Sequence, residues 1–280
     1  MTEALAGKHV LITGGGTGIG LACAARMRAD GAVVTLMGRT QAKLEAGAAK
    51  LREQSGPELR IASGDVANEE HVAAAVDVAA DASGALHGCV AAAGTGSFGP
   101  LLDMQRDQWE NVIGTNLTGT MLTIKFAGRA MTGGGAIVAI SSIAGVLTHR
   151  WMTAYCVSKA GIEMLVRNAA DELGGAGIRV NAVRPGLVPT DMAAGLVGNP
   201  QATADYLTQM PLHRLGTPED IGELVRFLIG PESGWVTGQI IASDGGHTLR
   251  RGPDLDPIAA AVMKVSQQRP WSGAVPSADS

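Results

Sequence analysis

Apolar residues along this chain gather in short, nearly continuous runs that are separated by longer amphipathic stretches. The apolar runs occupy residues 8–12, 33–37, 60–63, 88–93, 136–140, 179–183 and 239–242. Such runs are typical of strands that are buried on both faces of a parallel sheet. Helices are predicted between them, over residues 21–30, 41–54, 69–81, 107–129, 153–173 and 218–228. This alternation predicts an α/β fold, a doubly wound parallel sheet with helices on both faces.

The residues at two of the predicted helix starts agree with this interpretation. Asn68 and Thr217 stand at N-cap positions, and Pro218 occupies the first helical position after Thr217. No internal repeat or linker interrupts the pattern before residue 246. A chain of 280 residues suits one domain with a large core, or at most two. We therefore predict a single domain over residues 1–246.

Composition and charge narrow the classes of function. The net charge of −4 gives no reason to expect a nucleic acid or an anionic membrane as a partner. No apolar run is long enough to span a bilayer, and the first residues lack the apolar core of a signal peptide. The three cysteines, Cys23, Cys89 and Cys156, are odd in number and scattered, which indicates reduced thiols in a cytoplasmic protein.

A glycine-rich turn directly follows the first predicted strand. Residues 13–20 read Thr-Gly-Gly-Gly-Thr-Gly-Ile-Gly and lead into the first predicted helix. Gly14 permits a tight turn, Gly18 lets the backbone approach a pyrophosphate, and Gly20 lets the helix pack closely on the strand. The start of a helix also offers N–H groups and the positive end of a dipole to phosphates. We therefore interpret the strand, turn and helix as a dinucleotide-binding unit.

Tyr155 and Lys159 lie one helical turn apart, and Ser142 precedes the tyrosine by thirteen residues. Residues i and i+4 share a helix face, and a cation beside a phenol favours the phenolate and lowers its pKa. The Ser142 hydroxyl could hydrogen-bond the oxygen that gains or loses the proton. These groups suit the interconversion of an alcohol and a carbonyl. The alternative is a surface contact between Tyr155 and Lys159 on an amphipathic helix.

These residues and the motifs around them resemble the compact, single-domain branch of the short-chain dehydrogenase/reductase family. The motifs are Thr-Gly-x-x-x-Gly-x-Gly over residues 13–20, Asp65-Val66, Asn116, Ser142, Tyr155-x-x-x-Lys159 and Arg184-Pro185-Gly186. The resemblance extends from residue 7 to about residue 246. It implies a Rossmann-like sheet with the strand order 3-2-1-4-5-6-7 and an enzyme that depends on NAD or NADP.

The resemblance further implies that Asn116, Ser142, Tyr155 and Lys159 are the catalytic residues and form a proton relay. Tyr155 would donate the proton to a carbonyl oxygen that Ser142 polarises. Lys159 would lower the pKa of Tyr155 and hold the ribose of the cofactor. Asn116, which has Gly114 on one side and Gly119 on the other, would hold a water molecule at a helix kink. We expect no metal ion in this reaction.

The cofactor-binding residues implied by the resemblance come from the glycine-rich turn and from the ends of the other strands. They are Gly14, Gly16, Thr17, Gly18, Ile19, Arg39, Asp65, Val66, Ala92, Gly94, Tyr155, Lys159, Pro185, Gly186, Val188 and Thr190. Asp65 would close the adenine pocket, and Thr190 would touch the nicotinamide carboxamide. The chain departs from the family at Ala91-Ala92, where asparagines are usual, so we expect no side-chain hydrogen bonds to the ribose there.

The end of the second predicted strand bears on the choice between NAD and NADP. An Asp or Glu there would hold the ribose hydroxyls of NAD, whereas an Arg suits the 2′-phosphate of NADP. Gly38 occupies the acidic position, and Arg39, whose guanidinium can bind a phosphate bidentately, follows it. We therefore favour NADP. NAD stays open because Thr17 replaces a basic residue that some NADP-dependent relatives carry in the turn.

The residues near the catalytic set predict an apolar alcohol or ketone as the small-molecule substrate. The residues expected to contact it are Ser142, Val146, Trp151, Tyr155 and Met192. Residues 187–213 are predicted to form a mobile, apolar lid over the cleft. His149 either steers a polar group of the substrate or is a satisfied loop histidine.

Two other functions stay open at this point. One is a 3-oxoacyl thioester reductase that would dock an acyl carrier protein, with Arg129 and Arg167 as the candidate basic patch. The other is a catalytically silent NADP-binding regulator on the same fold. The presence of the complete Ser-Tyr-Lys set argues against the regulator.

Assembly is predicted from the resemblance alone. Relatives are commonly tetramers, so we expect a homotetramer, with a dimer as the alternative, built through the helices at 107–129 and 154–173 and the last strand. Residues 247–280 extend beyond the usual end of the family. Either part of this extension crosses onto a neighbouring subunit near its active site, or it is a frayed terminus.

Overall fold

The computed structural model of the protein describes residues 3–249. The described residues up to Thr248 belong to one compact unit. Of the predicted extension over residues 247–280, only the short 3₁₀ helix His247–Leu249 is described. The two hypotheses for the extension therefore concern residues outside the described part and stay predictions.

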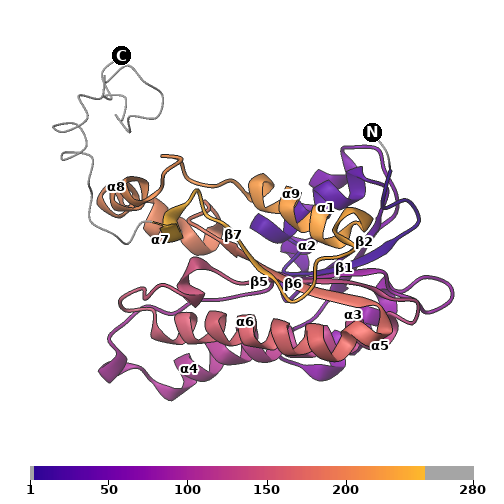
Figure 1. Cartoon of the computed structure of the whole chain (residues 1–280), viewed down its shortest axis with the longest axis horizontal. Coiled ribbons are helices and arrows are strands. Elements are labelled where there is room, and N and C mark those ends of the chain that lie inside the picture. The colour runs from indigo at the N-terminus through magenta and orange to yellow at the C-terminus, as the bar shows by residue number, and fades with distance from the viewer. Residues whose placement is uncertain (1–2, 250–280) are drawn as a thin grey trace, which may run out of the picture. The chain divides into compact units, whose positions relative to one another are not determined.

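The unit is built on a seven-stranded sheet in which all neighbouring strands run parallel. The strand order β3-β2-β1-β4-β5-β6-β7 confirms the predicted fold class. Figure 1 shows the sheet between two layers of helices. The strands are β1 (His9–Thr13), β2 (Val33–Gly38), β3 (Leu59–Ser63), β4 (Gly88–Ala91), β5 (Gly135–Ile140), β6 (Ile178–Pro185) and β7 (Ile240–Ser243). The order reverses at β1, which pairs with both β2 and β4. In open α/β sheets, ligands bind beyond the carboxyl ends of the strands at such a switch point.

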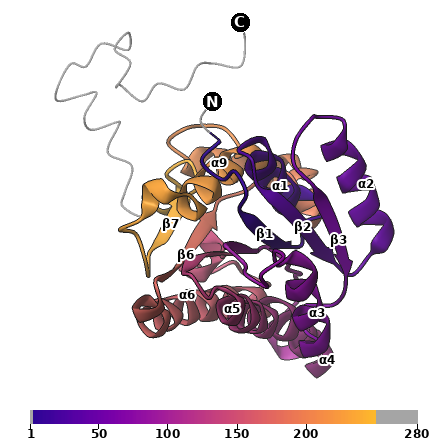
Figure 2. The ribbon, with the colours of Figure 1, turned by 90° about the vertical axis from the view of Figure 1, so that its right-hand side faces the viewer.

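Helices cover both faces of the sheet (Figure 2). One face carries α1 (Gly18–Ala29), α2 (Gln41–Arg52) and α9 (Pro218–Ile229), and the other carries α3 (Glu69–Ala79), α4 (Arg106–Ile113), α5 (Gly119–Ala130) and α6 (Thr153–Leu173). Two further helices, α7 (Ala194–Val197) and α8 (Pro200–Gln209), lie in the segment between β6 and α9. None of the helices in residues 3–249 is both long and apolar enough to cross a membrane.

Each face of the sheet has its own apolar core. Ile12 of β1 and Val225 of α9 belong to the first core, whereas Leu11, the neighbour of Ile12, belongs to the second core together with Ile162 of α6. Adjacent residues of a strand point to opposite faces, so a strand between two helical layers must be apolar at both. This is the physical reason for the continuous apolar runs in the sequence.

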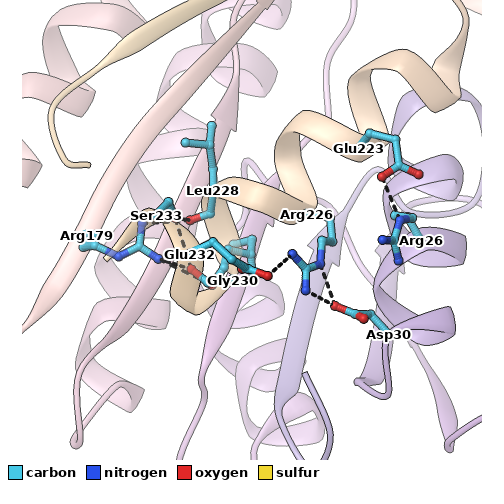
Figure 3. A network of polar contacts seen from close by, with 10 residues as sticks. Arg26, Asp30, Arg179, Glu223, Arg226, Leu228, Gly230, Glu232 and Ser233 are labelled. Carbon is cyan, nitrogen blue, oxygen red and sulfur yellow. Dashed lines mark hydrogen bonds and ion pairs between the residues drawn. The ribbon is translucent and has the colours of Figure 1, made fainter. Parts of the chain in front are cut away.

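A network of charged side chains joins α1 to α9 on the first face (Figure 3). Arg226 is 9% exposed and donates hydrogen bonds to Asp30 at 2.5 Å and to Glu232 at 2.6 Å. Arg26 and Glu223 form a more exposed pair at 2.8 Å between the same two helices. These contacts hold the C-terminal end of α1 against α9.

Two predicted elements differ in the structure, and two predicted helix caps are confirmed. The helix predicted over residues 107–129 is divided into α4 and α5 by a π-helical turn, Gly114–Thr118. The segment 187–213, predicted only as a lid, contains α7 and α8. The Asn68 side chain accepts a bond from the backbone of α3, and the Thr217 side chain does so for α9.

Candidate active site

The glycine-rich turn between β1 and α1 is a cradle with little room for side chains. A Cβ added to Gly14 would lie 2.8 Å from the backbone nitrogen of Ala93, and one on Gly20 would lie 2.3 Å from the carbonyl oxygen of Gly14. Gly14 and Gly18 have φ angles of 66° and 52°, in the region that favours glycine. The turn therefore needs glycine for both its conformation and its close packing.

The start of α1 is suited to bind an anion. Thr17 stands at the N-cap without a side-chain hydrogen bond to the helix, and the first turn of α1 has no acidic residue. By contrast, α3 and α9 each begin with a side-chain cap and two acidic residues. The first N–H groups of α1 thus have no side-chain acceptor, and they lie at the positive end of the helix dipole.

The end of β2 carries two cationic side chains. Arg39 is exposed, and its Nη1 lies 3.9 Å from Oδ2 of Asp65. Lys43, in the first turn of α2, pairs with Asp191 at 3.2 Å. The α2 helix also begins without a side-chain cap and without an acidic residue. This end of the crevice is therefore suited to a second anionic group.

Two predicted cofactor residues can contribute only backbone groups to a ligand. Val66 is 4% exposed and packs against Gly119, where an added Cβ would lie 2.6 Å from Cγ2 of Val66. A Cβ on Gly16 would lie 3.1 Å from the carbonyl oxygen of Lys43, so Gly16 serves the contact between the turn and α2.

A cavity of about 240 Å³ joins the glycine-rich turn to the ends of β4, β5 and β6. The predicted site residues that line it are Gly14, Thr17, Gly18, Ile19, Ala92, Gly94, Ser142, Tyr155, Lys159, Pro185, Gly186, Val188, Thr190 and Met192. Residues Gly16, Arg39, Asp65, Val66 and Asn116 lie outside this lining. Most of the other lining residues are apolar, among them Ile143, Met152 and Leu196.

Val146 and Trp151, which were predicted to contact the substrate, do not line this cavity. They are 52% and 39% exposed, and the guanidinium of Arg150 lies 4.3 Å from the centre of a Trp151 ring. His149 and Met152 of the same loop form this part of the cavity wall instead. A loop has no period that shows which of its side chains face inward, so the sequence could not decide between these residues. Contact of Val146 and Trp151 with the substrate stays a prediction.

Ser142, Tyr155 and Lys159 meet where β5 ends and α6 begins. Ser142 caps a 3₁₀ helix, Ile143–Gly145, and its Oγ accepts a bond from the nitrogen of Ala144 at 3.1 Å. The Nζ of Lys159 lies 5.5 Å from the centre of the Tyr155 ring. It also donates to the carbonyl oxygen of Ile140 at 2.8 Å, which anchors the ammonium group beside the phenol.

Burial decides the protonation of these groups. Desolvation raises the pKa of Tyr155, and hydrogen bonding to Ser142 opposes that rise. Burial lowers the pKa of Lys159 to about 8. The net shift of the Tyr155 pKa is therefore upward, because desolvation of the phenolate outweighs the hydrogen bonding to Ser142. The expected lowering of this pKa by Lys159 stays a prediction. The phenol stays protonated at neutral pH and can donate a proton.

Asn116 is fully buried in the π-helical turn. Its Nδ2 donates to the carbonyl oxygen of Thr95 and to Oγ of Ser158, both at 2.9 Å, and its Oδ1 accepts from the nitrogen of Thr95 at 2.8 Å. Its carbonyl oxygen accepts from Oγ1 of Thr120 at 2.6 Å. These bonds tie the loop after β4 to α6. The water-holding role of Asn116 stays a prediction, and the π-helical turn is a feature often found at functional sites.

A buried ion pair that was not predicted from the sequence lies next to the turn that follows Ser142. Nε and Nη2 of Arg184 donate to the two carboxylate oxygens of Glu163 at 2.9 and 2.7 Å. Oγ of Ser141 donates to Oε1 of the same carboxylate at 2.9 Å. A Cβ on Gly145 would lie 2.6 Å from that oxygen, so the carboxylate packs directly against the turn after Ser142. One signal was present in the sequence: Glu163 follows Lys159 by one helical turn.

The segment after β6 closes on the glycine-rich turn. A Cβ on Gly186 would lie 2.9 Å from Cα of Asp244, which packs the end of β6 against the residues after β7. The methyl carbon of Thr190 would lie 3.1 Å from a Cβ on Gly18. Val188 is buried at 4% exposure, so this part of the predicted lid is packed into the unit.

Comparison with known proteins agrees with this geometry. The family model described as enoyl-(acyl carrier protein) reductase matches residues 14–248. The chain is 39% identical to 2-(S)-hydroxypropyl-CoM dehydrogenase 3 of Xanthobacter autotrophicus and 38% identical to cis-4-hydroxycyclohexanecarboxylate dehydrogenase of Sinomonas cyclohexanicum. Each alignment covers 89% of this chain and 99% of the relative.

A solved structure shows the same likeness. The short-chain type dehydrogenase/reductase from Mycobacterium ulcerans superposes with a TM-score of 0.86 at 39% identity. The superposition covers 94% of this chain and 96% of the other. These matches in sequence and in fold show that the chain belongs to the short-chain dehydrogenase/reductase family of oxidoreductases.

Proposed function

We propose that this protein is an NADP(H)-dependent enzyme that interconverts a secondary alcohol and a ketone, with an apolar small molecule as its substrate. The observation that carries the proposal is that Ser142, Tyr155 and Lys159 line the same cavity as the glycine-rich turn. The dinucleotide and the reacting carbonyl would thus share one enclosed space.

The residues of the crevice fit a dinucleotide. The glycines of the turn admit a pyrophosphate close to the backbone, and the start of α1, which has no side-chain cap, offers it N–H donors. Lys159 lines the cavity and would hold the ribose, and Thr190, which borders the glycine-rich turn, would contact the nicotinamide. When bound, the nicotinamide supplies or accepts the hydride.

The charges at the end of β2 support NADP over NAD. A carboxylate there would repel a 2′-phosphate, whereas Arg39 and Lys43 would attract it. The uncapped start of α2 adds N–H donors at the same place. In this proposal Lys43 leaves Asp191 for the phosphate, at little cost because the pair is exposed.

The protein's own part in the reaction is proton transfer and positioning. During reduction, the buried phenol of Tyr155 donates its proton to the carbonyl oxygen while Ser142 donates a hydrogen bond to that oxygen. During oxidation, the phenolate of Tyr155 must form, and Ser142 is the neighbour that lowers the pKa of the phenol. Lys159 supplies a positive charge next to that phenolate, and Asn116 is proposed to connect it to solvent through a water molecule.

The apolar character of the cavity supports an apolar substrate. Ile143, Met152, Met192 and Leu196 line it near the catalytic wall. Burial of carbon skeletons on such a surface contributes roughly 25 cal/mol for each Å² removed from water. We expect hydrophobic ketones and alcohols to be better substrates than sugars or polyols.

Turnover with the two cofactors tests the proposal. NADPH and NADH are compared over a panel of hydrophobic ketones, with Tyr155→Phe as the control that keeps the ring and removes the proton donor. We expect NADPH-dependent reduction that is lost in Tyr155→Phe. Arg39→Glu should invert the preference between the cofactors, and unchanged selectivity would reject the role of Arg39.

The same panel separates the two alternative functions. The chain is 34% identical to a 3-oxoacyl-[acyl-carrier-protein] reductase of Chlamydia muridarum, so a 3-oxoacyl thioester belongs in the panel. Preference for the thioester would replace the small ketone as the substrate class. Tight cofactor binding without turnover of any compound would favour the silent regulator.

We also propose a homotetramer in the cytoplasm, with the dimer as the alternative. Met121 of α5 and the residues Val157 and Met164 of α6 are apolar and between 38% and 55% exposed, which supports pairing through these helices. The three thiols are unpaired, as suits a reducing compartment. Light scattering coupled to gel filtration would give the mass of the assembly.

A further inference from the structure

Two polar side chains of the cavity take no part in the proposed reaction. His149, in the loop between β5 and α6, and Tyr206, in α8, line the cavity together with Ser142 and Tyr155. Their ring centres lie 6.3 Å apart. Two separate elements of the fold thus bring a phenol and an imidazole to the end of the cavity where the substrate would react.

The Tyr206 hydroxyl is available as a hydrogen-bond donor. The ring is held by an edge-on contact with the ring of His247, with the centres 5.3 Å apart. Within residues 3–249 the hydroxyl has no hydrogen-bond partner. Burial and the neighbouring Tyr155 raise the pKa of Tyr206, so the hydroxyl keeps its proton. A polar group of the substrate would satisfy it.

The imidazole of His149 is held in a defined tautomer. Its Nδ1 lies 3.1 Å from the carbonyl oxygen of Leu147. Because a carbonyl oxygen only accepts hydrogen bonds, Nδ1 carries the hydrogen, and in the neutral ring Nε2 is an acceptor. The thiol of Cys156 lies 3.9 Å from the carbonyl oxygen of His149 and ties this loop to α6. His149 therefore offers a fixed acceptor beside the donor of Tyr206.

One donor and one acceptor side by side match a hydroxyl group, which itself accepts and donates. The cavity does not match a carboxylate or sulfonate equally well. Among the described lining residues, Lys159 is the one cation of the Lys or Arg type, and it is bound to Ile140 and assigned to the reaction. An anion in the cavity would therefore meet no Lys or Arg side chain of the described lining other than Lys159.

We propose that His149 and Tyr206 bind a second hydroxyl group of the substrate, so that the enzyme acts on an apolar hydroxyketone or the corresponding diol. This inference rests on the proposed function and narrows its substrate class. Ser142 and Tyr155 receive the reacting oxygen at one end of the molecule. Met152 and Leu196 cover the carbon skeleton, and the second hydroxyl lies between the imidazole and the phenol.

Binding to a complex that cannot react tests this recognition without turnover. The protein is saturated with NADPH and titrated in a calorimeter with secondary alcohols that carry a terminal hydroxyl on chains of increasing length. Each is matched to the alcohol with a methyl group in place of that hydroxyl. At one chain length at least, we expect the hydroxyl compound to bind about tenfold more tightly, since two neutral hydrogen bonds are gained.

Three variants assign the preference to the two residues. Tyr206→Phe removes only the hydroxyl, and His149→Asn keeps an N–H for Leu147 but lacks the second ring nitrogen. Tyr206→Phe and His149→Asn should each lower the affinity ratio from about tenfold to about threefold, because one of the two hydrogen bonds remains. Gln201→Ala, exposed on the same helix as Tyr206, should keep the full ratio. Cofactor affinity and thermal unfolding show whether each variant is folded. If only one of Tyr206→Phe and His149→Asn folds, that variant alone is sufficient for the test.

The outcomes separate this inference from the proposed function. Equal affinities in the unmodified protein, a ratio that survives in both Tyr206→Phe and His149→Asn, or tighter binding of the matched carboxylic acids would overturn the inference. Reduction of the corresponding ketones is measured in parallel. Absence of turnover with all ketones would count against the proposed function, while the affinity ratio would still decide whether His149 and Tyr206 recognise a hydroxyl.

Discussion

Replacing Glu163 by glutamine should lower the stability of the folded protein, because it breaks a buried ion pair next to the turn that follows Ser142. The Glu163 carboxylate accepts two hydrogen bonds from Arg184 and one from Ser141. Its side chain is 4% exposed, and that of Arg184 is 13% exposed. Glutamine keeps the shape of the side chain but has a single acceptor oxygen, so at least one donor loses its partner and the guanidinium loses its counter-charge.

The expected cost follows from this burial. Removing one partner of a buried ion pair costs about 3–5 kcal/mol, because the other charge stays out of water. Since glutamine retains one acceptor, we expect Glu163→Gln to lower the free energy of unfolding by about 2–4 kcal/mol. Arg184→Met should have a cost of the same order. The double variant should cost less than the sum of the two, because no isolated charge is left behind.

Urea unfolding at one fixed protein concentration measures these changes. The matched control is Glu110→Gln, which breaks the pair between Arg106 and Glu110 at 2.6 Å with side chains that are 88% and 57% exposed. An exposed pair of this kind contributes less than about 0.5 kcal/mol. Equal losses of stability in Glu163→Gln and Glu110→Gln would refute the argument from burial.

Three other predictions concern the titrating groups of the site and the core. The pKa of Lys159 is lowered from 10.5 to about 8 in the folded protein, so keeping this lysine protonated opposes folding below pH 8, and the opposition fades as the pH approaches 10.5. Lys159→Met should therefore gain about 2–3 kcal/mol more stability at pH 7 than at pH 10 in urea unfolding, and a gain independent of pH would contradict this. Ser142→Ala should move the rising, low-pH limb of the pH profile for alcohol oxidation to higher pH, because oxidation needs the Tyr155 phenolate and Ser142 lowers the pKa of Tyr155; an unmoved limb would argue against that contact. A thiol reagent at pH 8 should label Cys156 first, as burial raises the pKa of the other two cysteines to about 12, and mass spectrometry showing the reverse order would disprove it.

The sheet could be predicted because its strands are buried on both faces. Leu11 and Ile12 contribute to different cores, and this double burial is what produces a continuous apolar run. The order of the strands could not be obtained from such runs, since each strand has the same pattern. It came from the motifs that resemble a known family, and the pairing of the strands confirms it.

The geometry around Asn116 and Glu163 depends on contacts between distant parts of the chain. A π-helical turn differs from an α-helical turn by about one residue. Gly114 and Gly119 therefore indicated that the helix is irregular at Asn116, but not that the irregularity is a π-helical turn. Glu163 and Arg184 lie in different elements, and nothing local marks them as partners. The raised pKa of Tyr155 was not predicted either. It results from burial of the phenol in the folded protein, and the spacing between Tyr155 and Lys159 in the sequence does not show that burial.

The residues proposed for the reaction lie on well-packed elements, whereas those proposed for substrate recognition lie on a loop and on a less buried helix. Substitutions at the two sets should therefore have different effects. Ser142, Tyr155 and Lys159 are held by a strand end, a long helix and the buried ion pair behind them. His149 and Tyr206 lie on a loop and on α8, whose described residues include none that is fully buried. A change at His149 or Tyr206 disturbs few packed neighbours, so the loop and α8 can alter the preferred substrate while the proton-transfer geometry persists. A change at Glu163 reaches Ser142 through Ser141 and Gly145, and it should lower the turnover of every substrate together.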